Sequence, residues 1–201
     1  MLLEIIIAVL GLLIASFLLN FYRDPKRIIP KGDNIVSPAD GRVISIIDTA
    51  EKEIKVSKGL IGKIKIFTKD IADECYAVSI FMSPLDAHIN RAPIEGTIKS
   101  IKHTNGKFFK AYDLEKSLEN EKNEVVIENK NIKIKVIQIA GFLARRILCY
   151  KKANDKVNKG EKIGMIALGS QATMIIPKKI RLTIKLNDKL KAGESVIGEL
   201  I

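Results

Sequence analysis

The stretch "IALGSQATMIIP" (residues 166–177) joins two apolar runs that have the composition of β-strands, "KIGMIAL" (162–168) and "ATMII" (172–176). Between these runs stand Gly169 and Ser170. A Gly-Ser pair is ordinarily a turn, because glycine adopts backbone angles closed to other residues and serine bonds to its own backbone. The same pair also places a hydroxyl nucleophile beside the least hindered residue. The rest of the chain has to decide between these two interpretations.

Short runs of alternating apolar residues, separated by Gly and Pro, extend through most of the chain. Many short strands with turn signals between them favour a mainly β fold, either a sandwich or a partly closed barrel. The runs that we expect to form strands are 42–47, 54–56, 63–67, 76–82, 97–101, 124–128, 132–140, 145–150, 162–168, 172–176, 181–186 and 195–200.

Two stretches favour short helices instead, which makes the expected fold α+β. "SPLDAHINR" (83–91) begins with Ser83 and Pro84 and has Asp86 three residues after the serine, a start similar to a capping box. "AYDLEKSLENEK" (111–122) has apolar residues at helical spacing and charged residues between them.

Two internal repeats connect parts of the β region. "NDKVNKGEKIG" (154–164) recurs 33 residues later as "NDKLKAGESVIG" (187–198), and "PADGRV" (38–43) recurs as "PIEGTI" (93–98). Each resembles the turn-then-strand element of lipoyl and biotinyl carrier barrels, in which pseudo-symmetric hairpins interlock. The repeats therefore predict a β fold with internal pseudo-symmetry, and we interpret them as structural rather than catalytic.

Composition narrows the class of partner. A chain of 201 residues fits one domain with an appendage. Its 34 Lys and Arg against 23 Asp and Glu give a formal charge of +11, which suits nucleic acid, anionic lipid or an acidic substrate. Aromatic residues are scarce and Trp is absent, so a surface that stacks bases is not expected and we predict no nucleic-acid partner. Cys75 and Cys149 lie in or beside apolar runs and are expected to be buried free thiols in a reducing compartment.

The N-terminal run "IIIAVLGLLIASFLLNFY" (5–22) holds eighteen uncharged residues, about the least that can span a bilayer core. Its start, "MLLE", lacks the basic residues of a signal peptide. The cations that follow the run are Arg23, Lys26, Arg27 and Lys31. They favour a cytoplasmic C-terminal side and contact with anionic lipid. We expect residues 1–22 to anchor a domain of residues 23–201, peripherally or by spanning, at the cytoplasmic face of the cell membrane; a buried core helix is the alternative.

Six stretches follow one another in a specific order: "FYRDPKRIIP" (21–30), "SPADGRV" (37–43), "FMSPLDAHINRAPIEG" (81–96), "NEKN" (120–123), "IQIAGFLARRI" (137–147) and "LGSQATMIIP" (168–177). Together they resemble the phosphatidylserine decarboxylase family, in the short single-domain form of many bacteria and archaea. The resemblance implies a proenzyme that cuts itself between Gly169 and Ser170. The implied products are a large chain, 1–169, and a small chain, 170–201, which form a heterodimer with a covalent pyruvoyl group derived from Ser170.

The chemistry that the family implies explains why it needs a serine. Decarboxylation of an amino acid leaves a carbanion that requires an electron sink. The substrate supplies the amine of a Schiff base, so the protein has to supply a ketone, which no ordinary side chain carries. The Ser170 hydroxyl can attack the Gly169 carbonyl to form an ester. β-Elimination then leaves dehydroalanine, and its hydrolysis gives the pyruvoyl group with loss of ammonia.

Attack by serine also needs a base. His103, in "KHTNGK", is expected to be a solvated loop residue, whereas His88 lies within the family motif in "DAHINR", and the resemblance implies a catalytic role for it. An unperturbed imidazole pKa near 6.5 suits proton transfer near neutrality. Asp40 of "PADG" is expected to orient His88, as in a hydrolase triad with Ser170; the alternative is a turn residue before Gly41.

Three arginines are candidate substrate ligands. Longer members of the family carry a second histidine three residues after the first, and here that position is Arg91, which cannot act as a base near pH 7. Either His88 serves both self-cleavage and decarboxylation, or another group shares the work. Arg91 is a candidate clamp for a carboxylate or phosphate. Arg145 and Arg146 are candidates to bind the phosphate headgroup or to pair with interior acids.

Other functions stay open at this point. A lipoyl- or biotinyl-like carrier would need a modifiable lysine at a hairpin tip, and Lys156 and Lys189 lack the expected neighbours. A membrane-attached binding or structural protein would use Gly169-Ser170 only as a turn. No Cys/His cluster predicts a metal and no glycine-rich loop predicts a nucleotide. The lipid tails of the substrate, diacyl or archaeal ether, cannot be read from the sequence.

Overall fold

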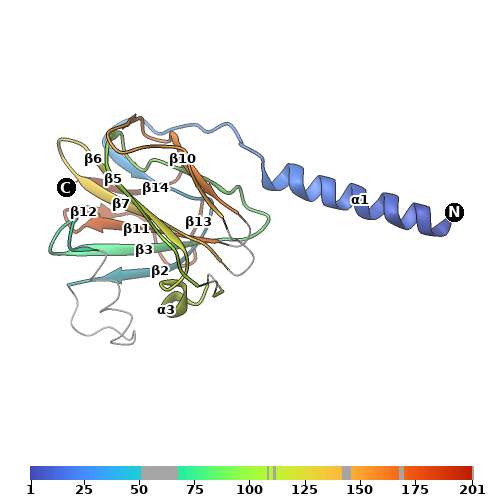
Figure 1. Cartoon of the computed structure of the whole chain (residues 1–201). Helices are drawn as coiled ribbons and strands as arrows, with labels where there is room; N and C mark the ends of the chain where they lie inside the picture. Colours follow the sequence, from blue (N-terminus) through green and yellow to red (C-terminus); the bar gives the residue numbers. More distant parts are fainter. Residues whose placement is uncertain (51–67, 108, 111, 142–145, 168–169, 201) are drawn as a thin grey trace.

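The computed structural model describes residues 1–50, 68–107, 109–110, 112–141, 146–167 and 170–200. An N-terminal helix, α1 (Leu2–Phe21), extends away from a body of strands, and the C-terminus lies on the far side of that body (Figure 1). Twenty helical residues measure about 30 Å, the thickness of a bilayer core. Among the described helices, α1 alone is long and apolar enough to cross a membrane, and none of its most apolar window is buried. The predicted N-terminal hydrophobic helix is confirmed.

The body is built around a curled sheet of eight antiparallel strands in the order β13-β2-β3-β11-β7-β6-β5-β9. Their bounds are β2 (Gly41–Asp48), β3 (Cys75–Met82), β5 (Gly96–Thr104), β6 (Lys122–Glu128), β7 (Lys133–Ile139), β9 (Lys156–Val157), β11 (Ser170–Pro177) and β13 (Lys189–Leu190). Strand β11 lies between β3 and β7 and is buried at all eight positions. Burial on both faces accounts for the unbroken apolar run at its end, residues 174–177. The predicted mainly β fold is confirmed.

Two three-stranded sheets complete the body. The first has the order β1-β14-β12, formed by β1 (Asn34–Val36), β14 (Val196–Leu200) and β12 (Ile180–Leu182). The second has the order β4-β10-β8, formed by β4 (Ile89–Arg91), β10 (Lys162–Ile166) and β8 (Ile147–Cys149). Side chains from all three sheets meet in one main core, which includes Ile35, Ile80, Ile163 and Met174. A second cluster, around Ile137 and Ile175, covers the other face of the large sheet.

The turns of the predicted 33-residue repeat have the same conformation. Asn154 and Asn187 both have a φ of 73°, while Gly160 and Gly193 have φ of 78° and 77°. These positive angles are the reason for Asn and Gly at the matching positions, since other residues are strained there. The first repeat forms β9, which pairs with β5, and the second forms β13, which pairs with β2.

The strands of the second repeat are equally well matched, at an offset of 55 residues. The amide of Val43 donates to the carbonyl of Asp188, and the amide of Ile98 donates to that of Asp155, both at 2.9 Å. The register also shifts at equivalent places, after Val43 in β2 and after Ile98 in β5. The predicted pseudo-symmetry is therefore confirmed, down to single hydrogen bonds and bulges.

The short helix predicted over 83–91 is wrong, because the chain forms a turn there and then a strand. Ser83 and Asp86 do form the expected cap, because the amide and hydroxyl of Ser83 donate to Asp86 Oδ2 at 2.8 and 2.7 Å. After this turn the chain becomes strand β4 instead of a helix, since Ile89–Arg91 pair with β10. Long-range strand pairing prevails there over the local helix signal.

Other predictions hold only in part. The helix predicted over 111–122 is reduced to α3 (Leu114–Ser117), and the predicted strands 54–56 and 63–67 lie outside the described residues. The short strands β1, β4, β9 and β13 were not predicted. Cys75 is buried, and burial raises the pKa of its thiol to about 11, but Cys149 is exposed on β8, contrary to expectation.

Candidate functional site

The fold brings Ser170 and His88 to the same corner. In the large sheet, β3 and β11 pair as far as Met82 and Ser170, while in the small sheet Ile89 of β4 pairs with Met165 of β10. The connection 83–88 therefore crosses between these two sheets, and β10 and β11 belong to the same two sheets. The amide of Ile166 also donates to the His88 carbonyl at 3.3 Å. Gly169 lies outside the described residues, but its neighbour Ser170 begins β11 at this junction.

Ser170 is fully buried, and its hydroxyl is only weakly engaged. Its Oγ lies 3.5 Å from the Met82 sulfur, and a thioether is a poor hydrogen-bond acceptor. A buried hydroxyl without a strong acceptor retains its proton and its lone pairs for another partner. This is an unusual state for a buried serine, because buried polar groups are nearly always well satisfied.

His88 is fully buried, and one of its ring nitrogens has no hydrogen-bond partner among the described residues. Its Nδ1 lies 2.9 Å from the carbonyl oxygen of Asp86, which can only accept, so Nδ1 donates and Nε2 carries the lone pair. The Phe21 ring at the end of α1 covers the imidazole, with 4.2 Å between ring centroids. Burial is the main reason that the pKa of His88 falls below its usual value. His88 is thus a neutral base at pH 7.

Asp40 does not make the predicted contact with His88. Its carboxylate accepts from Arg27 Nη2 at 2.9 and 2.8 Å and from the Ala192 amide at 2.7 Å. Among the described contacts, no hydrogen bond joins Asp40 to the imidazole, and the Asp86 carbonyl orients the ring instead. Asp40 acts on His88 only as a nearby negative charge, which affects the pKa of His88 much less than burial does. Arg27, expected at the lipid surface, is nearly buried in this ion pair.

A chain of three buried carboxamides leads to the same corner, and sequence reasoning missed it. Asn123 Nδ2 donates to Gln138 Oε1 at 2.9 Å, and Gln138 Nε2 donates to Asn90 Oδ1 at 2.8 Å. The Asn90 Nδ2 is thereby aimed at the Pro38 carbonyl, at 3.4 Å, and at the Met82 sulfur, at 3.7 Å. The three residues belong to three of the six family-like stretches, which was the only sequence signal that they act together.

The candidate arginines have different surroundings. Arg91 Nη2 pairs with Asp24, and its Nη1 donates to the Gly160 carbonyl at 2.9 Å, so its guanidinium is already engaged. Arg146 is exposed, and its carbonyl accepts from the Ala167 amide at 3.1 Å, which places it beside the connection that leads to Ser170. Arg145 lies outside the described residues. His103 is exposed, as expected, but lies on β5 with Glu121 at 3.5 Å.

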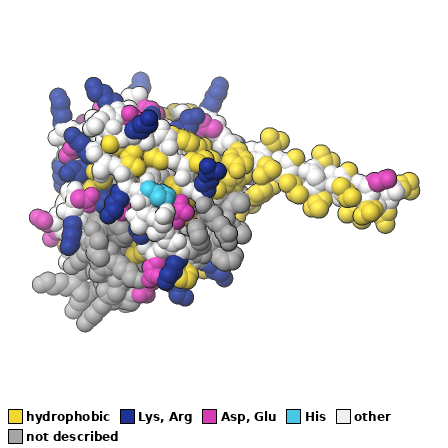
Figure 2. Space-filling model, in the orientation of Figure 1, with side chains coloured by type: hydrophobic (Ala, Val, Ile, Leu, Met, Phe, Trp, Pro, Cys, Tyr) yellow, Lys and Arg dark blue, Asp and Glu magenta, His cyan; other side chains and the backbone are white. Residues whose placement is uncertain are grey.

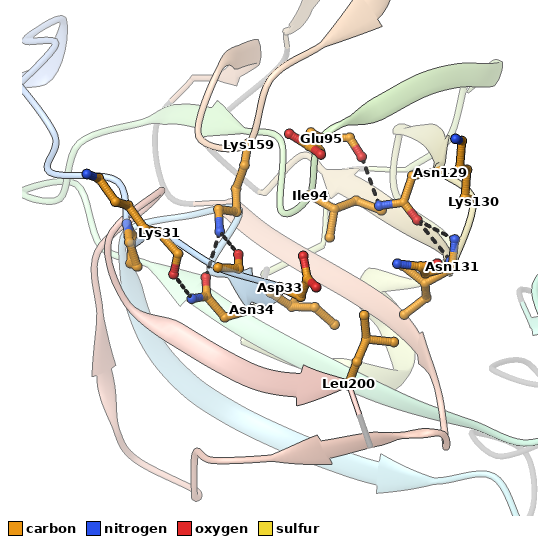
Figure 3. Close-up of a pocket in the computed structure, with 14 residues that line it drawn as sticks. Lys31, Asp33, Asn34, Ile94, Glu95, Asn129, Lys130, Asn131, Lys159 and Leu200 are labelled. Atoms are coloured by element: carbon orange, nitrogen blue, oxygen red, sulfur yellow. Dashed lines mark hydrogen bonds between the residues drawn. The ribbon is translucent and has the colours of Figure 1, made fainter.

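A pocket of the β domain lies away from this corner (Figure 3). It has a volume of about 650 Å³ and is lined mainly by residues 30–35, the turn 129–132 and Lys159. Lys159 Nζ donates to the Gly32 carbonyl and to Asn34 Oδ1, at 2.6 and 2.9 Å. The turn 129–132 joins β6 to β7 at the end opposite Ile139, the residue that pairs with Gln171. This pocket is therefore remote from Ser170. Within the described ranges, no group of three or more His, Cys, Asp or Glu side chains is placed to hold a metal.

Comparison with known proteins identifies the family of this chain. The sequence model of the family described as phosphatidylserine decarboxylase matches residues 14–198. A protein of Methanocaldococcus jannaschii, provisionally named archaetidylserine decarboxylase proenzyme, is 44% identical over 96% of this chain and 93% of its own. A protein of Chlorobium phaeobacteroides named phosphatidylserine decarboxylase proenzyme is 40% identical over 90% of this chain and 78% of its own. One of the same name from Geotalea uraniireducens is 35% identical over 97% of this chain and 84% of its own. The chain belongs to the phosphatidylserine decarboxylase family.

Proposed function

We propose that this protein is a self-processing decarboxylase of serine phospholipids. It would cut itself between Gly169 and Ser170, carry a pyruvoyl group at the start of the small chain, and convert a serine phospholipid to the ethanolamine phospholipid and carbon dioxide. Family membership supports the reaction. The observation that carries the mechanism is a buried, weakly engaged Ser170 hydroxyl at the same corner as the unpartnered Nε2 of a neutral His88.

The residues at the corner fit the formation of the group. His88 Nε2 takes the hydroxyl proton while Ser170 Oγ bonds to the Gly169 carbonyl carbon. The C–N bond then breaks, the nitrogen takes up a proton, and an ester replaces the amide. Removal of the α-proton of residue 170 expels the Gly169 carboxylate from Cβ. Hydrolysis of the resulting dehydroalanine releases ammonia. No oxidant or reductant is required.

Once formed, the pyruvoyl group supplies the carbonyl that accepts the electron pair released with carbon dioxide. The residues around it have separable tasks. His88 is placed to hold and return a proton, and the Asn90 amide is fixed as a donor by Gln138. The burial of His88 and Asn90 keeps water away from the reacting atoms. Arg146, exposed beside Ala167, is the candidate substrate ligand best placed to meet a phosphate, because Arg91 is engaged with Asp24.

Membrane attachment fits the same geometry. We propose that α1 anchors the protein and that the β domain lies at the cytoplasmic face of the cell membrane. Phe21, at the end of α1, packs on His88, Ile89 and Met165. The site would then lie where the anchor leaves the bilayer, so a lipid could present its serine headgroup while its tails remain in the membrane. Anionic lipids would complement the net charge of +11.

The relatives named for phosphatidylserine and for archaetidylserine share the serine headgroup but differ in their tails. We propose the headgroup as the recognised feature, since Ser170, His88 and Asn90 at the corner are polar and can bond to a headgroup but not to apolar tails. Decarboxylation of both lipids, presented in matched vesicles, would show which tails are accepted. Turnover of one lipid alone would assign the tails, and turnover of neither would contradict the proposed reaction.

Denaturing mass spectrometry of the purified protein tests self-processing directly. We expect a chain of residues 1–169 and a chain of residues 170–201 that is lighter, by one ammonia, than a peptide beginning with serine. Ser170→Ala should remain whole and inactive, while Ser100→Ala, at an exposed serine on β5, should process normally. An active preparation that consists of the intact chain alone would overturn the mechanism.

A further inference from the structure

Exposed apolar side chains of the β domain gather where α1 meets it. Beyond the helix, the described large apolar residues that are exposed are Tyr22, Ile28, Leu85, Tyr112, Leu148, Tyr150 and Leu186. Four of these surround the end of α1, and we call them the collar: Tyr22, Leu85, Leu148 and Tyr150. Figure 2 shows hydrophobic side chains that continue from the helix onto the adjoining surface of the body.

Two members of the collar are placed by contacts with the end of the helix. Tyr22 follows the last helical residue, and its ring meets that of Phe21 edge-on at 5.1 Å. Leu85 lies in the 83–88 connection, and its carbonyl accepts from Arg23 Nη2 at 2.8 Å. The Leu85 side chain is 69% exposed, although His88, three residues later, is fully buried. The connection thus presents an apolar side chain outward and the imidazole inward.

The other two members are placed by strand register. Leu148 of β8 is directly opposite Met165 of β10, and Met165 packs against Phe21. Residues directly opposite in a sheet share a face, so Leu148 faces the α1 side. Alternate residues of a strand also share a face, which puts Arg146 and Tyr150 on the same side. The Tyr150 amide continues the pairing by donating to the Ile163 carbonyl at 3.0 Å.

Cations and aromatic hydroxyls accompany the apolar groups. Arg146 and Lys26 are exposed, and Lys162 on β10 pairs with Asp24, just beyond the end of the helix. Tyrosine at the edge of an apolar surface, with Lys and Arg beside it, is the composition of a membrane interface, where amphipathic rings lie at the level of the headgroups. A protein partner would not explain why the collar continues into an exposed helix whose only charged residue is Glu4.

We propose that the collar is a bilayer-contact surface, so that the β domain itself rests on the membrane with Leu85, Leu148 and Tyr150 in the headgroup layer. This inference rests on the proposed anchoring by α1 and adds a second point of lipid contact. It also places the 83–88 connection, and with it His88, at the level from which a headgroup would enter. The hydrophobic drive comes from apolar area on the collar that is removed from water.

The absence of Trp from the chain allows each position to be probed by a single tryptophan. Four full-length variants, each with Ser170→Ala, are reconstituted in vesicles that contain an anionic lipid: L13W in α1, L85W and Y150W in the collar, and K130W in the exposed turn between β6 and β7. Quenching by lipids brominated near the headgroup or deep in the tails is then measured. None of these readings depends on self-cleavage.

We expect deep bromines to quench L13W, shallow bromines to quench L85W and Y150W with a blue shift in emission, and neither to affect K130W. If L13W is quenched while L85W and Y150W behave like K130W, the collar proposal is wrong and the anchor stands. If L13W is not quenched either, both are wrong. A blue shift of L85W that grows with protein concentration in detergent, without quenching by brominated lipid, would assign the collar to a second copy and would also overturn the proposal.

Discussion

The two three-stranded sheets are copies of one backbone design with different chemistry. β1 and β4 are related by the same 55-residue offset as the "PADGRV" and "PIEGTI" repeats. The amide of Arg91 donates to the Pro38 carbonyl at 2.9 Å, and the amide of Val36 donates to the Pro93 carbonyl at 3.0 Å, so each copy binds the other. We call the copy that contains β1 the first and the copy that contains β4 the second. The offset matches Asp33 with His88, Ile35 with Asn90 and Val36 with Arg91, so the side chains differ where the backbone is the same.

This difference shows which features serve the fold and which serve the site. Features present in both copies, such as the turns at Asn154 and Asn187, stabilise the architecture. Features present in one copy alone, such as a buried histidine or a buried amide, have no architectural need, since the other copy folds without them. At one pair of positions the special residue belongs to the first copy instead. Asp40 of the first copy is held in a nearly buried ion pair, whereas its counterpart in the second copy, Glu95, is exposed.

The largest effect should come from removing the titratable side chain at residue 88 of the second copy, compared with removing its counterpart at residue 33 of the first. His88→Gln should slow self-cleavage by about 100-fold or more, because a neutral proton acceptor is lost at Ser170. Asp33→Asn, at the matching position of the other copy, should leave the rate unchanged. The measurement is the fraction of cleaved chain against time by denaturing gel electrophoresis or mass spectrometry. Equal rates for the two variants would remove the functional distinction between the copies.

The acids of the two copies should differ in stability. Asp40→Asn leaves the Arg27 guanidinium nearly buried without its carboxylate, at a cost of about 3 kcal/mol in the free energy of unfolding. Glu95→Gln changes an exposed side chain and should stay within about 0.5 kcal/mol. Urea unfolding of uncleaved Ser170→Ala protein at pH 7 provides the comparison. A similar loss in both variants would mean that Asp40 has no special structural place.

Exchanging the central residues of β1 and β4 isolates the carboxamide chain. Asn90→Ile leaves Gln138 Nε2 buried without an acceptor and should cost about 1–3 kcal/mol. Ile35→Asn buries an amide in the main core and should cost a similar amount. Self-cleavage should be slowed by the first change alone. If Ile35→Asn slows it equally, general loss of stability explains both results.

The Phe21 ring covers His88, so pH should affect stability and self-cleavage through this residue of the second copy. Burial lowers the pKa of His88, so its proton is bound more weakly in the folded chain than in the unfolded one. Stability should therefore fall as pH decreases through about 6.5, and self-cleavage should lose its neutral base only below that pH. Phe21→Ala admits water and should raise the pKa, which moves the acid limb of the cleavage rate upward by as much as about one pH unit.

Phe17→Ala is the matched control for this shift, because the Phe17 ring stacks on Phe21, whereas the Phe21 ring lies on the imidazole. It should move the acid limb less than Phe21→Ala does. An acid limb that stays in place in both variants would show that Phe21 does not set the pKa of His88.

The smallest effect should be the same in both copies. Asn154 and Asn187 share a φ of 73°, so Asn154→Ala and Asn187→Ala should each cost about 1 kcal/mol in the free energy of unfolding. Thermal unfolding of uncleaved protein measures both. A clear inequality would indicate that the two turns are not structurally equivalent.

The sequence predicted the architecture better than the contacts of the site. Repeated turns and the apolar run of β11 are local signals, and both were read correctly. Strand β4 was missed because its pairing with β10 is formed by residues far apart in the chain. The link from Asn123 through Gln138 to Asn90, and the pairing of Asp40 with Arg27, depend likewise on the assembled sheets. Ser170 and His88 were identified by resemblance, and their roles stay predictions.

The position of Ser170 at the start of β11 has a consequence for the protein after scission. A small chain beginning at that residue would contribute the strand that is bonded on one side to β3 and on the other to β7, and its later strands would be bonded to β1 and β2. The two fragments would thus be hydrogen-bonded to each other from the moment of cleavage. They would need no docking step, and they could exchange partners only by unfolding. One covalent bond could be lost while the newly made end stays where it was created.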